Sequence, residues 1–127
     1  MPNIKPGAQI HLLHPAFKTV FRILDYAWPM YYPTDTDGWL ITSGHEGAPT
    51  DLPEPVHDID SKHYIINCKS GFGEAVDLRL NDVLQSRAHQ LAAILENVLL
   101  LVYGIRTKIF LENLLKQSAH FHVQVEL

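Results

Sequence analysis

The chain has one cysteine, no cluster of basic residues and no long apolar run, and each absence narrows its function. With Cys68 as the single cysteine among 127 residues, neither an internal disulfide nor a zinc cluster built from several cysteines can form. The net charge of −4 and the scattered lysines and arginines predict no nucleic-acid surface. The most apolar stretch, residues 98–103, is far shorter than a membrane-spanning helix, so we expect no membrane insertion.

Histidines, in contrast, are numerous. Eight histidines beside one cysteine indicate that any bound metal is held by imidazole and carboxylate groups. The length and the apolar fraction of 46% are typical of one globular domain, which we expect to span residues 1–127. The N-terminus has no basic start followed by an apolar run, which predicts synthesis without a signal peptide.

Hydrophobic periodicity predicts two helices. Apolar side chains recur at helical spacing over residues 15–29, and the proline at the end of this range is expected to end the helix. The stronger pattern covers residues 83–103, with Asn81 or Asp82 as its N-terminal cap and Gly104 as its C-terminal cap. Its expected apolar stripe comprises Leu84, Ala88, Leu91, Ala92, Leu95, Val98, Leu99 and Val102.

The β-prone segments are predicted to be strands at residues 39–42, 75–80, 105–112 and 121–127. Alternation places Asp77 opposite the apolar face of its strand, and it places His120 and His122 together on the polar face of the last strand. The order of elements predicts an α+β fold. We expect helices packed on one face of a small antiparallel sheet, with the site on the open face.

The remaining segments are expected to be irregular. Prolines and glycines interrupt residues 1–14, and residues 43–60 show no period, so we expect a long functional rim or lid there. His45 and His57 in this loop are expected to be solvated, and His89 is expected on the helix surface.

The residues around Ser61–Arg79 carry the strongest chemical signal. His63 and Asp77 are two metal-ligand types on either side of a glycine-bearing loop, and the last strand adds the HxH pair. If His63, Asp77 and His122 converge, two imidazoles and one carboxylate can hold zinc and leave a fourth position for water, as a hydrolytic site requires. An HxH pair alone is a weak signal, because ligation needs a third group within reach.

The ordered set of motifs resembles small phage-encoded members of the zinc D-Ala-D-Ala metallopeptidase family, the grouping of lysostaphin, D-Ala-D-Ala peptidases and sonic hedgehog. The similarity extends over nearly all of the chain after residue 15. The matching segments are Ile41–Gly44, Ser61–Tyr64, Gly73–Arg79, Ile109–Glu112 and His120–Val123.

This resemblance implies zinc ligands at His63, Asp77 and His122 and catalytic roles for Glu112 and His120. It implies cleavage of peptidoglycan stem peptides by a carboxypeptidase or an endopeptidase, of the kind found in phage endolysins. We expect Glu112 to be the general base and His120 to stabilise the oxyanion, although His120 remains an alternative base. Such an enzyme, made in the cytoplasm, would act at the cell wall after phage-assisted release or as a virion component.

Two departures from the family pattern leave alternatives open. Eight residues, Ile65–Phe72, stand between Tyr64 and Gly73 where the family has one. They either form an inserted hairpin or move His63 out of register. His45 stands where many relatives have an arginine for the substrate carboxylate. Both departures fit a catalytically inactive relative that acts as a cell-wall-binding or virion structural module. A zinc enzyme of the same fold acting on another amide is a further alternative.

Overall fold

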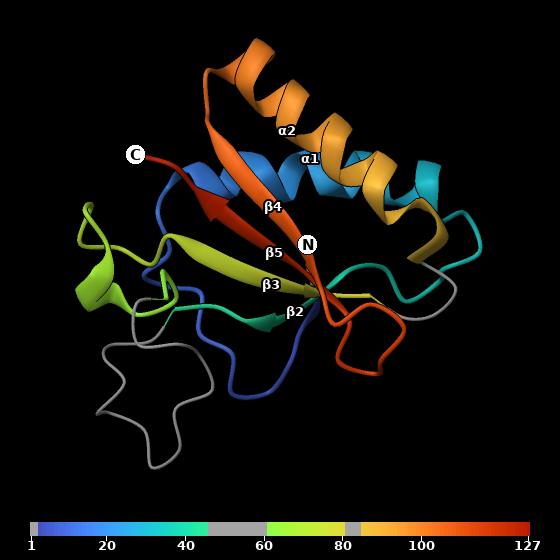
Figure 1. The fold of residues 1–127 in the computed structure, drawn as a ribbon, viewed down its shortest axis with the longest axis horizontal. Helices are drawn as coiled ribbons and strands as arrows, with labels where there is room; N and C mark the ends of the chain where they lie inside the picture. Colours follow the sequence, from blue (N-terminus) through green and yellow to red (C-terminus); the bar gives the residue numbers. More distant parts are fainter. Residues whose placement is uncertain (1–2, 46–60, 81–84) are drawn as a thin grey trace.

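A computed structural model describes residues 3–45, 61–80 and 85–127 and shows a small α+β fold (Figure 1). Five strands form one sheet in the order β1-β2-β3-β5-β4. The β1–β2 pair is parallel, and the other neighbours are antiparallel. The strands are β1 (Asn3–Ile4), β2 (Leu40–Ser43), β3 (Ala75–Arg79), β4 (Thr107–Glu112) and β5 (His120–Val125).

Both helices, α1 (Ala16–Tyr31) and α2 (Ala88–Tyr103), lie on the same side of the sheet (Figure 1). Their inward residues form one core with the sheet, and the rings of Trp28 in α1 and Phe121 in β5 lie 6.3 Å apart between centroids. The predicted arrangement of helices on one face of a largely antiparallel sheet is therefore confirmed.

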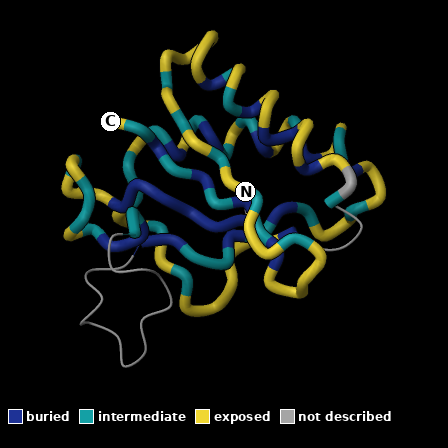
Figure 2. The backbone as a smooth tube through the Cα atoms, in the orientation of Figure 1, coloured by how far each residue is buried: buried dark blue, intermediate teal, exposed yellow. Residues whose placement is uncertain are grey.

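The two central strands each have an apolar and a polar face. Val76 and Leu78 of β3 belong to the core, and so do the apolar residues of β5, namely Phe121, Val123 and Val125. Because successive side chains of a strand point to opposite faces, Asp77, His120 and His122 lie on the face away from the helices. Figure 2 shows these strands as the most deeply buried part of the tube, with the helices exposed on their outer sides.

The end of α1 differs from the prediction. Pro29 lies inside the helix, which continues to Tyr31. A proline in the last turn removes a single intrahelical hydrogen bond, whereas burial of Trp28 (1% exposed) anchors this turn in the core. The Tyr32 N–H then closes the helix on the Trp28 carbonyl at 2.8 Å.

Helix α2 ends where the sequence predicts, but its N-terminus and its last buried position differ from the prediction. Gly104 ends the helix in the left-handed conformation (φ 68°) and donates its N–H to Leu100, as expected. At the other end, Gln85–Arg87 form a tight 3-10 turn instead of α-helix. The expected caps Asn81 and Asp82, and Leu84 of the expected stripe, lie outside the described residues. Val102 is 68% exposed, so its place in the buried stripe is wrong, because the last turn of α2 projects beyond the core (Figure 1).

The N-terminal segment is more ordered than its prolines and glycines predict. It forms β1, and farther along it makes backbone hydrogen bonds to the residues that follow β2 and to those that precede β3. His14 N–H donates to the Gly73 carbonyl at 2.8 Å, and Gly73 N–H donates to the Leu12 carbonyl at 2.7 Å. The segment thus borders the polar face of the sheet on the side of β2. Of the loop predicted at 43–60, residues 46–60, including His57, lie outside the described residues.

Candidate metal centre

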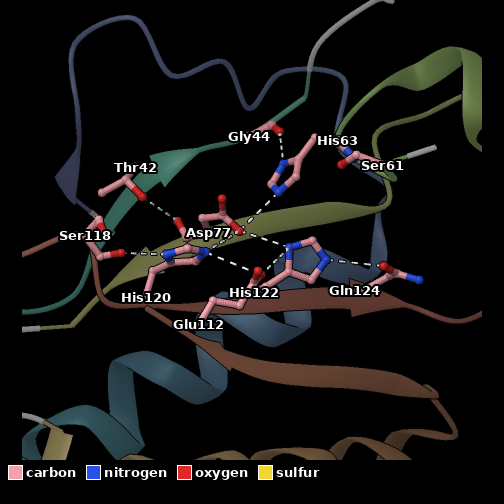
Figure 3. A network of polar contacts seen from close by, with 10 residues as sticks. All are labelled: Thr42, Gly44, Ser61, His63, Asp77, Glu112, Ser118, His120, His122 and Gln124. Atoms are coloured by element: carbon pink, nitrogen blue, oxygen red, sulfur yellow. Dashed lines mark hydrogen bonds and ion pairs between the residues drawn. The ribbon is translucent and has the colours of Figure 1, made fainter. Parts of the chain in front are cut away.

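Strand register brings the candidate site residues together. In the antiparallel β3–β5 pair, Asp77 lies directly opposite His122, and in the β4–β5 pair, Glu112 lies opposite His120. Directly opposed residues of such a pair have neighbouring side chains on the same face. Four of the five predicted site residues are therefore placed by pairing alone, and His63 joins them from the segment that precedes β3 (Figure 3).

The three predicted ligands converge on one point. His63 Nε2 and His122 Nδ1 each lie 3.1 Å from Asp77 Oδ1. His63 and Asp77 are buried, with 1% and 7% of their surface exposed, and His122 is half-buried. One ligand atom from each lies within 4.8 Å of the others, so this group can hold a metal ion. The prediction that these residues meet is confirmed.

In each histidine, the ring nitrogen that points away from the site lies beside a hydrogen-bond acceptor, which fixes the orientation of the ring (Figure 3). His63 Nδ1 lies 2.7 Å from the Gly44 carbonyl oxygen, and His120 Nδ1 lies 2.8 Å from the Ser118 carbonyl oxygen. A carbonyl only accepts, so both nitrogens must carry the proton. In the neutral rings, the inward Nε2 atoms then present lone pairs to the site.

His122 is oriented in the same way by a side chain of its own strand. Its Nε2 lies 3.2 Å from Gln124 Oε1, and the Gln124 amide nitrogen donates to Glu126 Oε1 at 3.2 Å. That second bond turns the amide oxygen toward His122, which therefore donates from Nε2 and presents the Nδ1 lone pair to Asp77. The sequence analysis did not identify Gln124, although its i, i+2 spacing from His122 places it on the same face.

The electrostatics of this cluster favour a cation. Burial by itself would raise the pKa of Asp77, but hydrogen bonds from His122 and His63 and the charges of His63 and His120 hold it well below its usual range. Burial by itself would lower the pKa of His122, but the hydrogen bond to Asp77 and the charge of that carboxylate raise it overall. Without a cation, the Nδ1 lone pair of His122 would lie 3.1 Å from the Asp77 carboxylate oxygen and repel it. The ring therefore binds a proton at the nitrogen that could otherwise bind a metal ion.

The two predicted catalytic residues flank the ligands. His120 Nε2 lies 3.4 Å from Glu112 Oε1 and 3.8 Å from Asp77 Oδ1. Asp77, Glu112 and His120 form a second group whose ligand atoms are close enough to hold a metal ion. Because Asp77 belongs to both groups, we treat them as one centre. The Glu112 side chain is 49% exposed, so this carboxylate forms the solvent-facing side of the centre.

The Ile65–Phe72 segment does not separate His63 from Asp77, whose side chains lie 3.1 Å apart. The predicted hairpin is wrong, because the segment is a 3-10 turn (Ile65–Asn67) followed by bends. Its two ends are held together by the Glu74 N–H, which donates to the Lys62 carbonyl at 3.2 Å. Because the chain returns to the point from which this segment starts, its length does not move His63 away from Asp77.

Side-chain hydrogen bonds hold the same segment against the turn that carries His63. Lys62 Nζ donates to the Asn67 carbonyl at 2.7 Å, and Asn67 Nδ2 donates to the Ser61 carbonyl at 3.0 Å. Ser61 Oγ accepts the His63 N–H at 3.2 Å, which fits the expected loop-fixing role for this serine. Burial raises the pKa of the Cys68 thiol, in agreement with its reading as an ordinary, unactivated residue.

His45 is buried, so the expectation of a solvated loop histidine is wrong. It is 4% exposed because the N-terminal segment covers it: its N–H donates to the Gln9 carbonyl at 2.9 Å, and the His11 ring lies 4.6 Å away. Its Nε2 has no hydrogen-bond partner among the described residues. Burial, with a smaller effect of His11, lowers the pKa of His45, so this residue offers no permanent positive charge for a carboxylate. His89, in contrast, is exposed on α2 as predicted.

Comparison with known proteins adds no relative: no model of a protein family, no curated protein and no solved structure matches the chain. Among the described residues, no helix is both long enough and apolar enough to cross a membrane. The argument for function therefore depends on the chemistry of the centre itself.

Proposed function

We propose that this protein is a zinc-dependent peptidase that cleaves peptide bonds in bacterial peptidoglycan stem peptides. The observation that carries the hydrolytic part of the proposal is the convergence of His63 Nε2, Asp77 Oδ1 and His122 Nδ1 within a buried cluster. The substrate class is supported by the resemblance of the ordered motifs to the cell-wall metallopeptidases.

Zinc fits this donor set better than other common divalent metals. Two imidazoles and one carboxylate, without thiolates, are typical of catalytic zinc sites that retain an open position. Calcium and magnesium prefer sites built from oxygen ligands. When bound, zinc supplies a Lewis acid for the scissile carbonyl and lowers the pKa of its water toward neutrality.

The protein groups around this position have separate roles. Glu112 lies on the exposed side, 3.4 Å from His120, and accepts the proton of the attacking water as general base. His120 is fixed through Nδ1 by the Ser118 carbonyl, which directs Nε2 toward the reacting carbonyl. In its protonated form it donates from Nε2 to the developing oxyanion.

The first test is the zinc content of the purified protein and of two ligand variants. The parent is expected to bind about one zinc per chain, and His63→Ala and His122→Ala are expected to bind almost none. His89→Ala serves as the matched control, since this histidine is exposed on α2 and contacts none of the proposed ligands. Zinc retained by His63→Ala would contradict the ligand assignment.

The second test is digestion of purified peptidoglycan, with release of amino groups or of D-alanine as the readout. The parent and His89→Ala are expected to release product. Glu112→Gln is expected to lose activity by about 100-fold or more while it keeps its zinc, since it removes the base and not a ligand. A parent that binds zinc and adheres to peptidoglycan without releasing any product would contradict the peptidase proposal and support the binding-module alternative.

A further inference from the structure

Strand pairing arranges the side chains around the candidate metal centre in rows that cross the sheet. One row runs over β3, β5 and β4 and consists of Arg79, His120 and Glu112. The next row begins with Asp77 and His122. Directly opposed residues of paired strands have neighbouring side chains. The two proposed catalytic residues, His120 and Glu112, lie side by side in Figure 3. Arg79 is the third member of their row.

Arg79 is exposed on the face of the sheet that carries the centre. Its neighbours Leu78 and Leu80 are 0% exposed and belong to the core, whereas Arg79 is exposed, so alternation places it on the opposite face. The Leu80 N–H donates to the Ala119 carbonyl at 2.8 Å. The next pair, Arg79 and His120, is therefore of the non-hydrogen-bonded kind, in which Cα atoms lie about 4.5 Å apart and side chains are closest.

The charge of Arg79 is not neutralised by the centre beside it. Within the described part of the chain, its guanidinium has no hydrogen-bond or ion-pair partner. Asp77 Oδ1 lies 3.1 Å from His122 Nδ1. Glu112 Oε1 lies 3.4 Å from His120 Nε2. Because the carboxylates of the centre face imidazoles, the arginine remains a cation that an external anion can bind.

Two lysines near the centre differ from Arg79 in this respect. Lys62, in the turn before β3, donates from Nζ to the Asn67 carbonyl at 2.7 Å. Lys108, on the same face of β4 as the centre, has its Nζ 3.7 Å from Glu126 Oε1. Both lysine charges therefore have acceptors from the chain itself, and the charge of Arg79 stays available to a ligand.

We propose that Arg79 binds a carboxylate of the substrate, so that the site selects peptides with a free carboxylate near the scissile bond. This inference rests on the proposed peptidase function. The planar guanidinium donates two parallel hydrogen bonds to a carboxylate, which gives direction as well as affinity. The chain carries a net charge of −4, which repels anionic peptides in general. A cation beside the catalytic groups attracts them at the one place where they react.

A stem peptide offers this carboxylate from two sources. One is the C-terminal carboxylate, whose recognition places the cut near the end of the peptide. The other is the α-carboxylate of a γ-linked D-glutamate within the peptide, whose recognition is typical of internal cleavage. Three probes distinguish them: the pentapeptide L-Ala-γ-D-Glu-L-Lys-D-Ala-D-Ala, its C-terminal amide, and the same peptide with D-isoglutamine in place of the D-glutamate. The probe whose amidation weakens binding identifies the source.

Calorimetric titration of the zinc-loaded protein with the three peptides tests the proposal, in a Glu112→Gln background that prevents turnover. The fully acidic peptide is expected to bind about 10-fold or more tightly than one of the amidated peptides. Arg79→Gln is expected to abolish this preference, and Arg79→Lys, which keeps the charge but not the fork, to retain part of it. Lys108→Gln is the matched control, since it removes the same charge from the same face, and it is expected to keep the preference.

Zinc content and circular dichroism establish that each variant is loaded and folded. Equal affinity for the three peptides, or a preference that survives Arg79→Gln, would overturn the assignment even if the parent cleaves peptidoglycan. Absence of binding to any of the peptides would also overturn it. A preference that depends on Arg79, in a protein whose parent form releases no product, would support the assignment while the proposed peptidase activity fails.

Discussion

Gly44 shows how a single residue shapes the candidate metal centre. Its carbonyl oxygen accepts a hydrogen bond from His63 Nδ1–H, with 2.7 Å between the nitrogen and the oxygen, and this bond directs Nε2 toward Asp77. A Cβ atom at this position would lie 1.9 Å from the Gln9 carbonyl oxygen, so no other residue fits without displacing the N-terminal segment. The orientation of a ligand therefore depends on a residue that has no side chain, through close approach of two backbones.

His122 is expected to make the stability of the metal-free protein depend on pH. Its pKa is raised by Asp77 in the folded state, so the protonated ring stabilises that state. This contribution is fully present below the unfolded pKa of about 6.5 and is lost as pH rises through the higher folded pKa. In chelator-treated protein, the difference in unfolding free energy between the parent and His122→Gln should therefore shrink between pH 5.5 and 8.5, as a buffer series of urea titrations would measure.

His89→Gln is the control for that measurement, because the histidine it replaces is exposed on α2. Its difference from the parent should stay constant across the series. The buried His45 contributes in the opposite direction, since its lowered pKa disfavours the folded state in acid, but this effect is common to the parent and both variants. A parent–His122→Gln difference that grows with pH would contradict the assigned direction.

Among the elements, the Ile65–Phe72 segment is held as a closed loop by a buried carboxylate at its end. Glu74 is 2% exposed, and its Oε2 accepts the Ser70 N–H at 2.9 Å and the Ser70 hydroxyl at 2.8 Å. Together with the closure on Lys62, these bonds fix the loop without any sheet pairing of its own. A loop of this length is tolerated because the entropic cost of closing a loop rises only slowly with its length.

Removal of this carboxylate is expected to loosen the loop. Glu74→Ala should lower the free energy of unfolding by about 1–3 kcal/mol, because the Ser70 donors lose their acceptor and the buried side-chain volume is lost. Hydrogen exchange should show lower protection of the Ser70 amide. Glu74→Gln keeps an acceptor oxygen and should lose less stability. Unchanged protection of the Ser70 amide in Glu74→Ala would show that the loop is held by other contacts.

At the scale of the whole molecule, the core and the candidate metal centre occupy opposite faces of the same strands. In β5, Phe121 packs toward α1 between two histidines that point the other way. None of the residues of α1 or α2 belongs to the candidate centre, although both helices pack on the opposite face of the strands that carry it.

Truncation of the largest buried side chain of α1 is expected to destabilise the core. Trp28→Ala should lower the free energy of unfolding by about 3–5 kcal/mol, because it empties the space between α1 and β5. Tyr26→Ala is the control on the same helix; Tyr26 is 76% exposed, so a change within about 0.5 kcal/mol is expected. Urea denaturation measures both. Equal effects of the two variants would contradict this account of the core.

Much of the candidate centre was predictable because it depends on short-range geometry. Alternation along a strand has a period of two residues, so the placement of Asp77, His120 and His122 on polar faces follows from local sequence alone. The helix end at Gly104 was predictable for the same reason, since a left-handed cap is a local property. At Pro29, the local signal for a helix end was overridden by packing. Burial of the neighbouring Trp28 keeps this turn helical, and α1 continues to Tyr31.

The sequence by itself thus determined the candidate ligands, the strand faces on which they lie and the α+β class, because each depends on spacings of a few residues. Tertiary structure alone decided that His63 reaches Asp77, since this depends on how the Ile65–Phe72 loop closes and on the Gly44 carbonyl. It also decided the burial of His45, which is covered by a segment more than thirty residues earlier in the chain. Contacts between distant segments have no periodic signature in the chain, so only the folded molecule reveals them.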